Sequence, residues 1–283
     1  MAEVLVDAHL HLWDPSRLRY PWLDGVPLLS RPYLPVDIDA AIAGLQVEQQ
    51  VFVQCDCIPS QSLEEAHWVA SLAQASPRIA GIVAHAPVEL GEAVRAHVEE
   101  LARIPLVKGI RRLIQGEQDP HFCTRPQFVA GVKELALFGL SFDLCLRADQ
   151  LPAALELVRS CPQVSFVIDH CAKPDIRSHA MEPWRTDMRA IAGLPNVSCK
   201  ISGLVTEADA KAWVASDLKP YIDHAISCFS PDRCMYGGDW PVVLLASSYR
   251  RWADTFLAAI ATLGADERRK VCATTARRVY RLG

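Results

Sequence analysis

Short apolar runs rich in β-branched residues alternate with longer amphipathic segments along the chain. The short runs predict strands at residues 4–12, 50–55, 79–86, 106–113, 140–146, 164–170, 197–203 and 234–239. The longer segments predict helices near residues 38–48, 62–75, 89–103, 126–138, 149–160, 181–193, 207–228 and 248–263, with a final helix over 266–280. Strict alternation of strands and helices favours a parallel sheet that helices cover.

Eight such units favour a closed (β/α)8 barrel of the TIM type over an open sheet. The sequence has 283 residues, a length typical of one barrel, and no Pro-, Gly- or Ser-rich linker divides it. The first strand is not followed by a Gly-x-Gly-x-x-Gly motif, which argues against dinucleotide binding. We therefore expect residues 1–283 to form a single α/β domain with an extra C-terminal helix and no organic cofactor.

Local signals at helix ends agree with this assignment. Ser62 and Glu65 have the spacing of a capping box, which predicts that a helix begins there. Gly139 and Gly264 each follow a predicted helix, a position at which glycine often ends one.

The composition is that of a globular protein, with 51% hydrophobic and 22% charged residues. The formal net charge is −4 and no basic block stands out, so nucleic acid and anionic membranes are poor partners. We expect no membrane span and no signal peptide. The ten cysteines lie mostly in apolar runs, which favours buried free thiols and a cytoplasmic location.

The candidate chemistry lies at the predicted carboxyl ends of the strands, where barrel enzymes carry their active sites. The first strand contains Asp7, His9 and His11, which the alternation of strand side chains puts on one face. His170 ends the sixth strand and Asp239 follows the eighth. Each group alone is compatible with an ordinary strand end, surface histidine or turn. Together they would point into one pocket, which favours a functional site.

Arg111 is predicted at the rim of the fourth strand if Val107 and Gly109 face the barrel interior. A guanidinium in that position binds a carbonyl or carboxylate oxygen. A register shift of one residue would bring Arg112 there instead.

Further candidates for substrate contact are a loop glutamine, a strand lysine, a strand-end histidine and an aromatic residue of the long irregular segment 13–36: Gln115, Lys200, His85 and Trp22. Lys200 is equally compatible with a structural lysine, and His85 with an inert histidine. Asp143, on the fifth strand, is better explained as a structural, hydrogen-bonded carboxylate.

Five stretches of the chain resemble the lactonase-type branch of the amidohydrolase superfamily, also called the amidohydrolase 2 family. They are residues 6–15, 108–111, 168–174, 199–207 and 235–241, and they occur in the order of that branch over essentially the whole chain. The Tyr20-Pro21-Trp22-Leu23 loop is most similar to that of sugar-acid lactonases, such as those acting on L-fuconolactone, L-rhamnonolactone or L-galactonolactone.

The resemblance implies a hydrolase of carbohydrate catabolism that opens a small sugar lactone. It implies that Asp239 is the general base, that His9, His11 and His170 position water or lactone, and that Arg111 polarises the carbonyl. Water attack needs a base, and the developing oxyanion needs a cationic or hydrogen-bonding partner. The ring size and the oligomeric state are left open.

The sequence departs from the binuclear members of the superfamily. The fifth strand ends without histidine, and Lys108 comes too early to bridge two metals. Two alternatives follow. Either one zinc is bound by His9, His11 and Asp239, with or without His170, or Arg111 acts as the electrophile and the metal is weakly bound or dispensable.

Two other functions share the same residues. A metal-dependent decarboxylase would need a firmly bound metal, against which the arginine argues. A non-catalytic sugar-binding barrel would bind its ligand without turnover.

Overall fold

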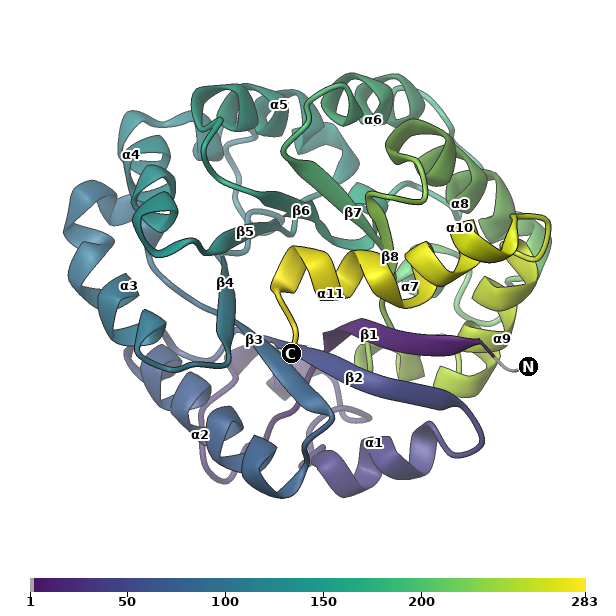
Figure 1. Cartoon of the computed structure of the whole chain (residues 1–283), viewed down its shortest axis with the longest axis horizontal. Coiled ribbons are helices and arrows are strands. Elements are labelled where there is room, and N and C mark those ends of the chain that lie inside the picture. Colours follow the sequence, from purple (N-terminus) through teal and green to yellow (C-terminus); the bar gives the residue numbers. More distant parts are fainter. Residues whose placement is uncertain (1–2) are drawn as a thin grey trace.

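The computed structural model describes residues 3–283. Eight parallel strands follow one another around a barrel in chain order (Figure 1). They are β1 (Val4–Leu10), β2 (Gln46–Val53), β3 (Ile79–Ala84), β4 (Val107–Arg111), β5 (Ser141–Leu144), β6 (Phe166–Ile168), β7 (Val197–Ile201) and β8 (Cys234–Tyr236). A parallel bridge between Leu10 and Trp240 joins the first strand to the segment after the last. The predicted (β/α)8 barrel is confirmed.

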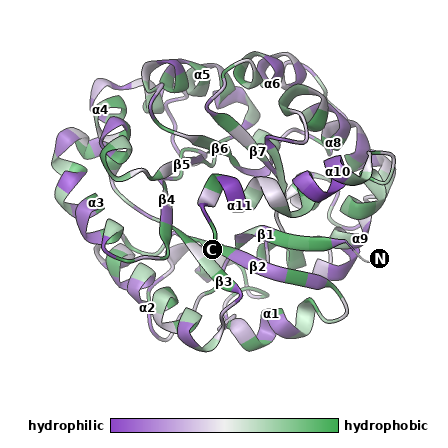
Figure 2. Ribbon diagram, viewed as in Figure 1, coloured by the Kyte–Doolittle hydropathy of each residue, from purple (hydrophilic) through white to green (hydrophobic). Residues whose placement is uncertain are grey.

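Helices form a ring outside the strands (Figure 1). They are α1 (Pro35–Ala41), α2 (Ser62–Ala75), α3 (Arg95–Ala102), α4 (Pro126–Glu134), α5 (Leu151–Ser160), α6 (Trp184–Ala192), α7 (Leu204–Glu207), α8 (Ala215–Phe229) and α9 (Tyr249–Ala259). Hydrophobic and hydrophilic positions alternate along these helices (Figure 2). Their buried residues pack with the outward side chains of the strands into one large core. None of the helices in residues 3–283 combines the length and hydrophobicity that a bilayer crossing requires.

The C-terminal segment closes one end of the barrel. Helix α10 (Ala265–Arg269) continues through a π-helical turn into α11 (Thr275–Tyr280), which crosses the end where the strands begin (Figure 1). Ala273, Ala276 and Tyr280 pack there against inward side chains of the strands: Val6, Ala8, Val51, Val53, Val83, Val167 and Met235. The predicted extra helix is therefore present, and the opposite end, at the carboxyl ends of the strands, is left to form a site.

Two helix predictions were wrong at their ends. The helix predicted over 38–48 ends at Ala41, because Gly44 adopts a left-handed φ of 80° and the chain turns into β2. The helix predicted over 207–228 is two helices, α7 and α8, separated by residues 208–214. Asp209 accepts the backbone N–H groups of Lys211 and Ala212, which stabilises a turn in that gap.

The helix-end signals had mixed outcomes. Gly139 ends a helix with a φ of 63°, as predicted, but Gly264 precedes α10 with a φ of −60° and belongs to its start. Ser62 and Glu65 form no capping box. The Ser62 hydroxyl donates to the Pro59 carbonyl, and the Glu65 carboxylate accepts the Cys55 N–H.

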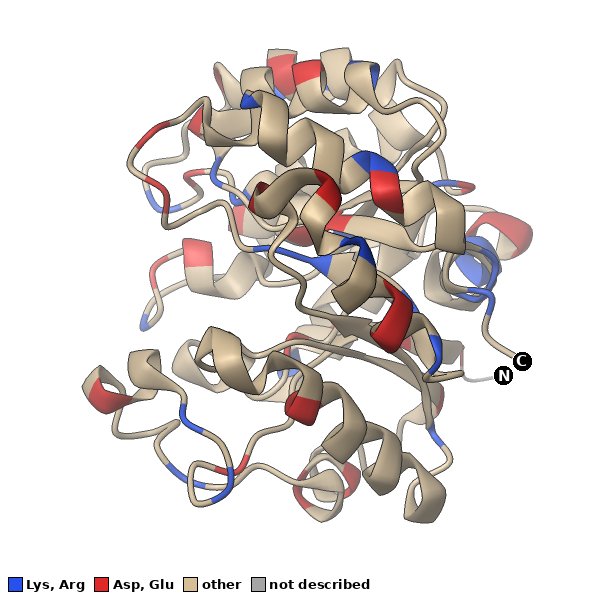
Figure 3. Ribbon diagram, turned by 90° about the vertical axis from the view of Figure 1, so that its left-hand side faces the viewer, with Lys and Arg blue, Asp and Glu red and all other residues tan. Residues whose placement is uncertain are grey.

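The surface charges are mixed, and the cysteines are mostly buried. On the side shown in Figure 3, acidic and basic residues are interspersed over the outer elements. All ten cysteines are free thiols, and nine of them are buried. The predicted buried thiols are confirmed.

Candidate active site

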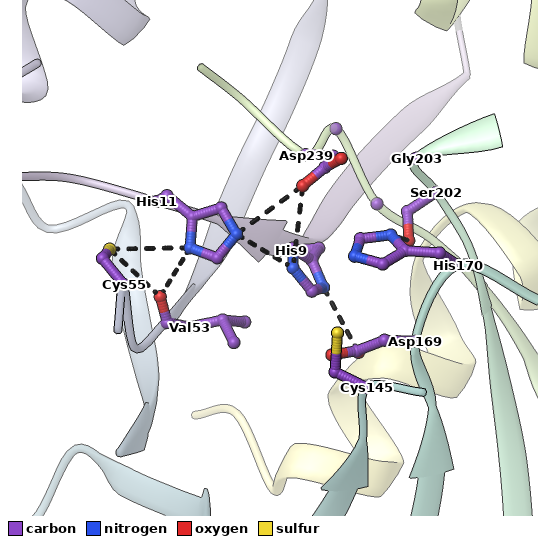
Figure 4. A network of polar contacts seen from close by, with 12 residues as sticks. His9, His11, Val53, Cys55, Cys145, Asp169, His170, Ser202, Gly203 and Asp239 are labelled. Carbon is purple, nitrogen blue, oxygen red and sulfur yellow. Dashed lines mark hydrogen bonds and ion pairs between the residues drawn. The ribbon is translucent and has the colours of Figure 1, made fainter. Parts of the chain in front are cut away.

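The polar residues predicted at the strand ends gather at the carboxyl end of the barrel. Arg111 ends β4, while His9 and His11 come from the end of β1 and the residue that follows it. His170 follows β6 and Asp239 follows β8. All five side chains are buried. Figure 4 shows His9, His11, His170 and Asp239 pointing toward one another.

The register of β1 shifts between Asp7 and Leu10, and this shift separates Asp7 from the two histidines. The Asp7 carboxylate accepts the Gly238 N–H at 2.6 Å and the hydroxyl of Tyr249, in α9, at 3.0 Å. The prediction that Asp7 shares the face of His9 and His11 was therefore wrong. Asp7 instead ties β1 to the segment that carries Asp239.

A left-handed turn after β6 aims His170 at the pocket. Residues 170–173 all have positive φ, with values of 54°, 50°, 59° and 50°. Each non-glycine residue in this conformation costs roughly 1–2 kcal/mol, so the surrounding structure must hold the turn. The Ser202 hydroxyl lies 2.9 Å from His170 Nδ1. Gly203, with a φ of 61°, leaves room for the ring, because a Cβ there would lie 2.4 Å from His170 Nδ1.

His9, His11 and Asp239 form the centre of the site. The two Nε2 atoms lie 3.2 Å apart, and Asp239 Oδ1 lies 3.8 Å from His9 Nε2 and 3.6 Å from His11 Nε2. His11 Nδ1 lies 2.7 Å from the Val53 carbonyl, which fixes the ring. Asp239 Oδ1 is buried and has no hydrogen-bond partner among the described residues. It is therefore free to accept a proton or a metal.

Arg111 is the arginine that reaches the site. Its Nη1 lies 3.0 Å from Asp169 Oδ2 and 3.4 Å from His9 Nε2, and its Nη2 donates to the Gln54 carbonyl at 2.5 Å. Its Nε is buried and finds no acceptor within residues 3–283. Arg112 instead pairs with Glu89 and Glu117 away from the pocket.

Lys200 lies beneath the site in a fully buried ion-pair network. Its Nζ lies 2.7 Å from Asp143 Oδ2, 3.0 Å from Asp169 Oδ1 and 3.3 Å from His9 Nδ1. The hydroxyl of Tyr280, in α11, donates to the same Asp143 oxygen at 2.6 Å. Lys200 is 0% exposed, so the prediction that it contacts substrate was wrong. Its role is structural, beneath the pocket.

Burial and neighbouring charges set the protonation of the site. Burial lowers the pKa of His170 to about 4 and also lowers those of His9 and His11, so the rings are neutral at pH 7. Burial alone would raise the pKa of Asp239, but the neighbouring imidazoles of His170, His11 and His9 together outweigh it and lower that pKa. Asp239 is therefore a carboxylate at neutral pH.

These groups open onto a pocket of about 230 Å³. Its lining includes His11, Arg111, His170 and Asp239, together with the aromatic residues Trp13 and Trp22 and the polar residues Asp56, Gln115, Lys173 and Thr206. Trp22 and Gln115 thus lie where the sequence prediction put them. His85 is not part of the lining, and His9 lies under it, fully buried.

Sequence reasoning missed two residues of the site. Asp169 is one, and its carboxylate joins Arg111, Lys200 and His9. Lys173 lines the pocket at the end of the left-handed turn. The signal for both was their position beside His170, but the backbone turn that directs Lys173 inward has no sequence signature.

The donor set fits a zinc ion. Tetrahedral ligands at the usual Zn–N distance lie about 3.3 Å apart, close to the separation of the His9 and His11 Nε2 atoms. Asp239 Oδ1, free of hydrogen bonds among residues 3–283, supplies a third donor. Ligand atoms of His9, His170 and Asp239 also lie within 4.8 Å of one another. The nearby Arg111 guanidinium opposes a second cation.

Comparisons with known proteins agree with this architecture. The sequence model of the amidohydrolase family matches residues 6–282. An L-fucono-1,5-lactonase from Burkholderia ambifaria is 31% identical over 98% of this chain and 95% of its own length. An L-fucono-1,5-lactonase from Burkholderia multivorans is 32% identical over 100% of this chain and 97% of its own length.

A solved structure is similar over the same range. An amidohydrolase from Burkholderia multivorans, crystallised with bound zinc, superimposes with a TM-score of 0.89 at 32% identity, covering 99% of this chain and 100% of that one. The family model and these relatives span nearly the whole sequence, including every residue of the site described above. The chain belongs to the amidohydrolase family.

Proposed function

We propose that the protein is a lactonase that opens the ring of a neutral sugar-acid lactone, an aldonolactone such as L-fuconolactone, by attack of water. The observation that carries this proposal is the buried, ionised Asp239, whose Oδ1 has no hydrogen-bond partner in the described chain and faces two histidines. The similarity to L-fucono-1,5-lactonases over nearly the full length supports the choice of substrate.

Asp239 acts as the general base. The Asp239 carboxylate, which lines the pocket, accepts a proton from water as the water attacks the lactone carbonyl. His11 and His170 flank this carboxylate and orient the water or the lactone, and Ser202 holds His170 in place. The water oxygen bonds to the carbonyl carbon, and the carbonyl oxygen takes up the negative charge as a tetrahedral intermediate forms. The ring carbon–oxygen bond breaks when the carbonyl re-forms, and the proton held by Asp239 passes to the leaving alkoxide.

Arg111 stabilises the oxyanion. It lines the pocket, so its guanidinium can donate to the carbonyl oxygen. Its pairing with Asp169 and the Gln54 carbonyl fixes the guanidinium before substrate arrives. A preorganised donor of this kind lowers the activation barrier for forming the tetrahedral intermediate by on the order of 3 kcal/mol.

A zinc ion bound by His9, His11 and Asp239, with His170 nearby, would polarise the carbonyl and acidify water. We propose that this metal is weakly bound and dispensable, because Arg111 Nη1 lies only 3.4 Å from His9 Nε2 and already supplies a positive charge. We propose no organic cofactor.

The lactone ring is held by the pocket wall. Trp13 and Trp22 cover an apolar face of the sugar, and Gln115 and Thr206 are placed to hydrogen-bond its hydroxyls. The volume of about 230 Å³ suits one sugar ring. The buried free thiols support a reducing compartment, which we propose to be the cytoplasm.

Acid release from a panel of aldonolactones, read with a pH indicator, tests the proposal. We expect rapid release from at least one neutral sugar lactone, largely unchanged after chelation. Activity that disappears with chelator and returns with zinc would keep the lactonase but transfer the electrophilic role to the metal. No acid release from any lactone would refute the proposal and direct attention to decarboxylation, measured as CO2 release from hydroxybenzoates.

A further inference from the structure

A second ion pair borders the pocket, besides that of Arg111 with Asp169. Lys173 lines the pocket, and its Nζ lies 3.7 Å from Glu207 Oε1, at the end of α7. The two side chains are 22% and 26% exposed, so substrate entering the pocket meets them in a partly dehydrated setting. Thr206, the neighbour of Glu207, also lines the pocket.

The positive side chains of the pocket lining are paired with carboxylates, whereas the negative ones are not paired with lysine or arginine in residues 3–283. Both cations of the lining have a carboxylate partner outside it, since Arg111 pairs with Asp169 and Lys173 pairs with Glu207. The carboxylates of the lining, Asp56 and Asp239, have no ion-pair partner of this kind with a lysine or arginine in residues 3–283. The groups around the pocket therefore carry a net negative charge toward an incoming ligand.

We propose that Glu207 determines specificity by neutralising Lys173, so that the site accepts uncharged lactones and rejects lactones that carry a carboxylate or sulfonate. This inference rests on the proposed lactonase function. An anionic substituent would lie near Asp56 and Asp239, the carboxylates of the lining, while losing water, and like charges brought together in this way are repelled. Glu207 offsets the attraction that Lys173 would otherwise supply. A neutral hydroxyl accepts a hydrogen bond from Lys173 without breaking its pairing.

The test compares the best neutral aldonolactone with the analogue that carries a carboxylate in place of its terminal carbon substituent. For the unmodified enzyme we expect a kcat/KM for the neutral lactone at least about tenfold higher than for the anionic one. Glu207→Gln should reduce this ratio by about tenfold, mainly through a lower KM for the anionic lactone, because Lys173 becomes available to pair with it. Added salt should weaken the gain.

Two further variants complete the test. Glu117→Gln is the matched control, because Glu117 pairs with Arg112 outside the pocket lining, and it should leave the ratio unchanged. Lys173→Met leaves Glu207 without its cation and should increase the ratio, so it carries the test if Glu207→Gln fails to fold. A ratio that stays constant in both Glu207→Gln and Lys173→Met overturns the inference but not the lactonase. Absence of turnover on every lactone overturns both.

Discussion

Replacing Lys200 by methionine is expected to destabilise the protein strongly and in a pH-dependent way. Lys200 Nζ lies 2.7 Å from Asp143 and 3.0 Å from Asp169, and all three side chains are 0% exposed. Methionine has a similar length but no charge, so the variant would keep two buried carboxylates after losing the cation they share. Asp169 would retain Arg111, while Asp143 would retain only hydrogen bonds from hydroxyl groups.

Removing one partner of a buried ion pair costs about 3–5 kcal/mol. One kcal/mol corresponds to about 2–4 °C in Tm for large domains, so we expect the Tm at pH 7 to fall by about 6–20 °C. Burial raises the pKa of Asp169, but Lys200, His9 and Arg111 together outweigh it, with Lys200 the largest of the three, and hold that pKa well below its ordinary value. The stability from this pairing is therefore present at neutral pH and is lost as the pH falls through the acidic range.

Thermal unfolding between pH 4 and pH 8 measures this effect. The difference in Tm between the two proteins should shrink toward pH 4, because the unpaired carboxylates of the variant can then take up protons. A second substitution, Asp143→Asn, should restore part of the lost stability at pH 7. Lys219→Met is the surface control, since Lys219 and Asp223 are about half exposed, and it should change the Tm little. A Lys200→Met protein with an unchanged Tm at pH 7 would refute the reasoning.

Three further predictions concern the backbone, a buried acid and the metal. Gly203→Ala should reduce kcat at least about tenfold, because the new Cβ would displace the His170 ring and alanine would be strained at the positive φ of residue 203. A kcat equal to that of the unmodified enzyme would contradict this. Burial raises the pKa of Glu65 from 4.5 to about 8. The stability of the folded protein therefore falls as the pH rises above 4.5, because the unfolded chain then loses the Glu65 proton more readily than the folded one. Glu65→Gln should therefore be more stable by about 1–3 kcal/mol at pH 7 in denaturant unfolding, with no gain near pH 4.5. Zinc titration by calorimetry after chelation should show one weak site, which His11→Ala abolishes; two tight sites would exclude the arrangement described.

Much of the site could be predicted because it follows from two regular features of the fold. The alternation of apolar strands and amphipathic helices predicts the barrel, and the barrel puts the carboxyl ends of all strands at one rim. His11, Arg111, His170 and Asp239 line the pocket for this reason. The prediction of one domain over residues 1–283 stays a prediction.

The parts that were not predicted depend on local backbone geometry and on how deeply a side chain is buried in the barrel. The shift in β1 turns Asp7 away from the histidines, and a strict alternation of side chains cannot reveal it. Lys200 has the strand position of a pocket residue, but the carboxylates of Asp143, in β5, and Asp169, just after β6, hold its amine beneath the pocket. The inward direction of Lys173 depends on four successive positive φ angles. None of these features has a sequence period.

The central claim is tested most directly by the rate of ring opening in Asp239→Asn with the best neutral aldonolactone. Asparagine keeps the size of the side chain but cannot accept the proton of water, so kcat should fall at least about a thousandfold while the Tm shows a folded protein. Loss of this size, with the lactone still bound, is the result that the account predicts. An Asp239→Asn enzyme that opens the lactone at a rate within about tenfold of the unmodified protein would contradict it.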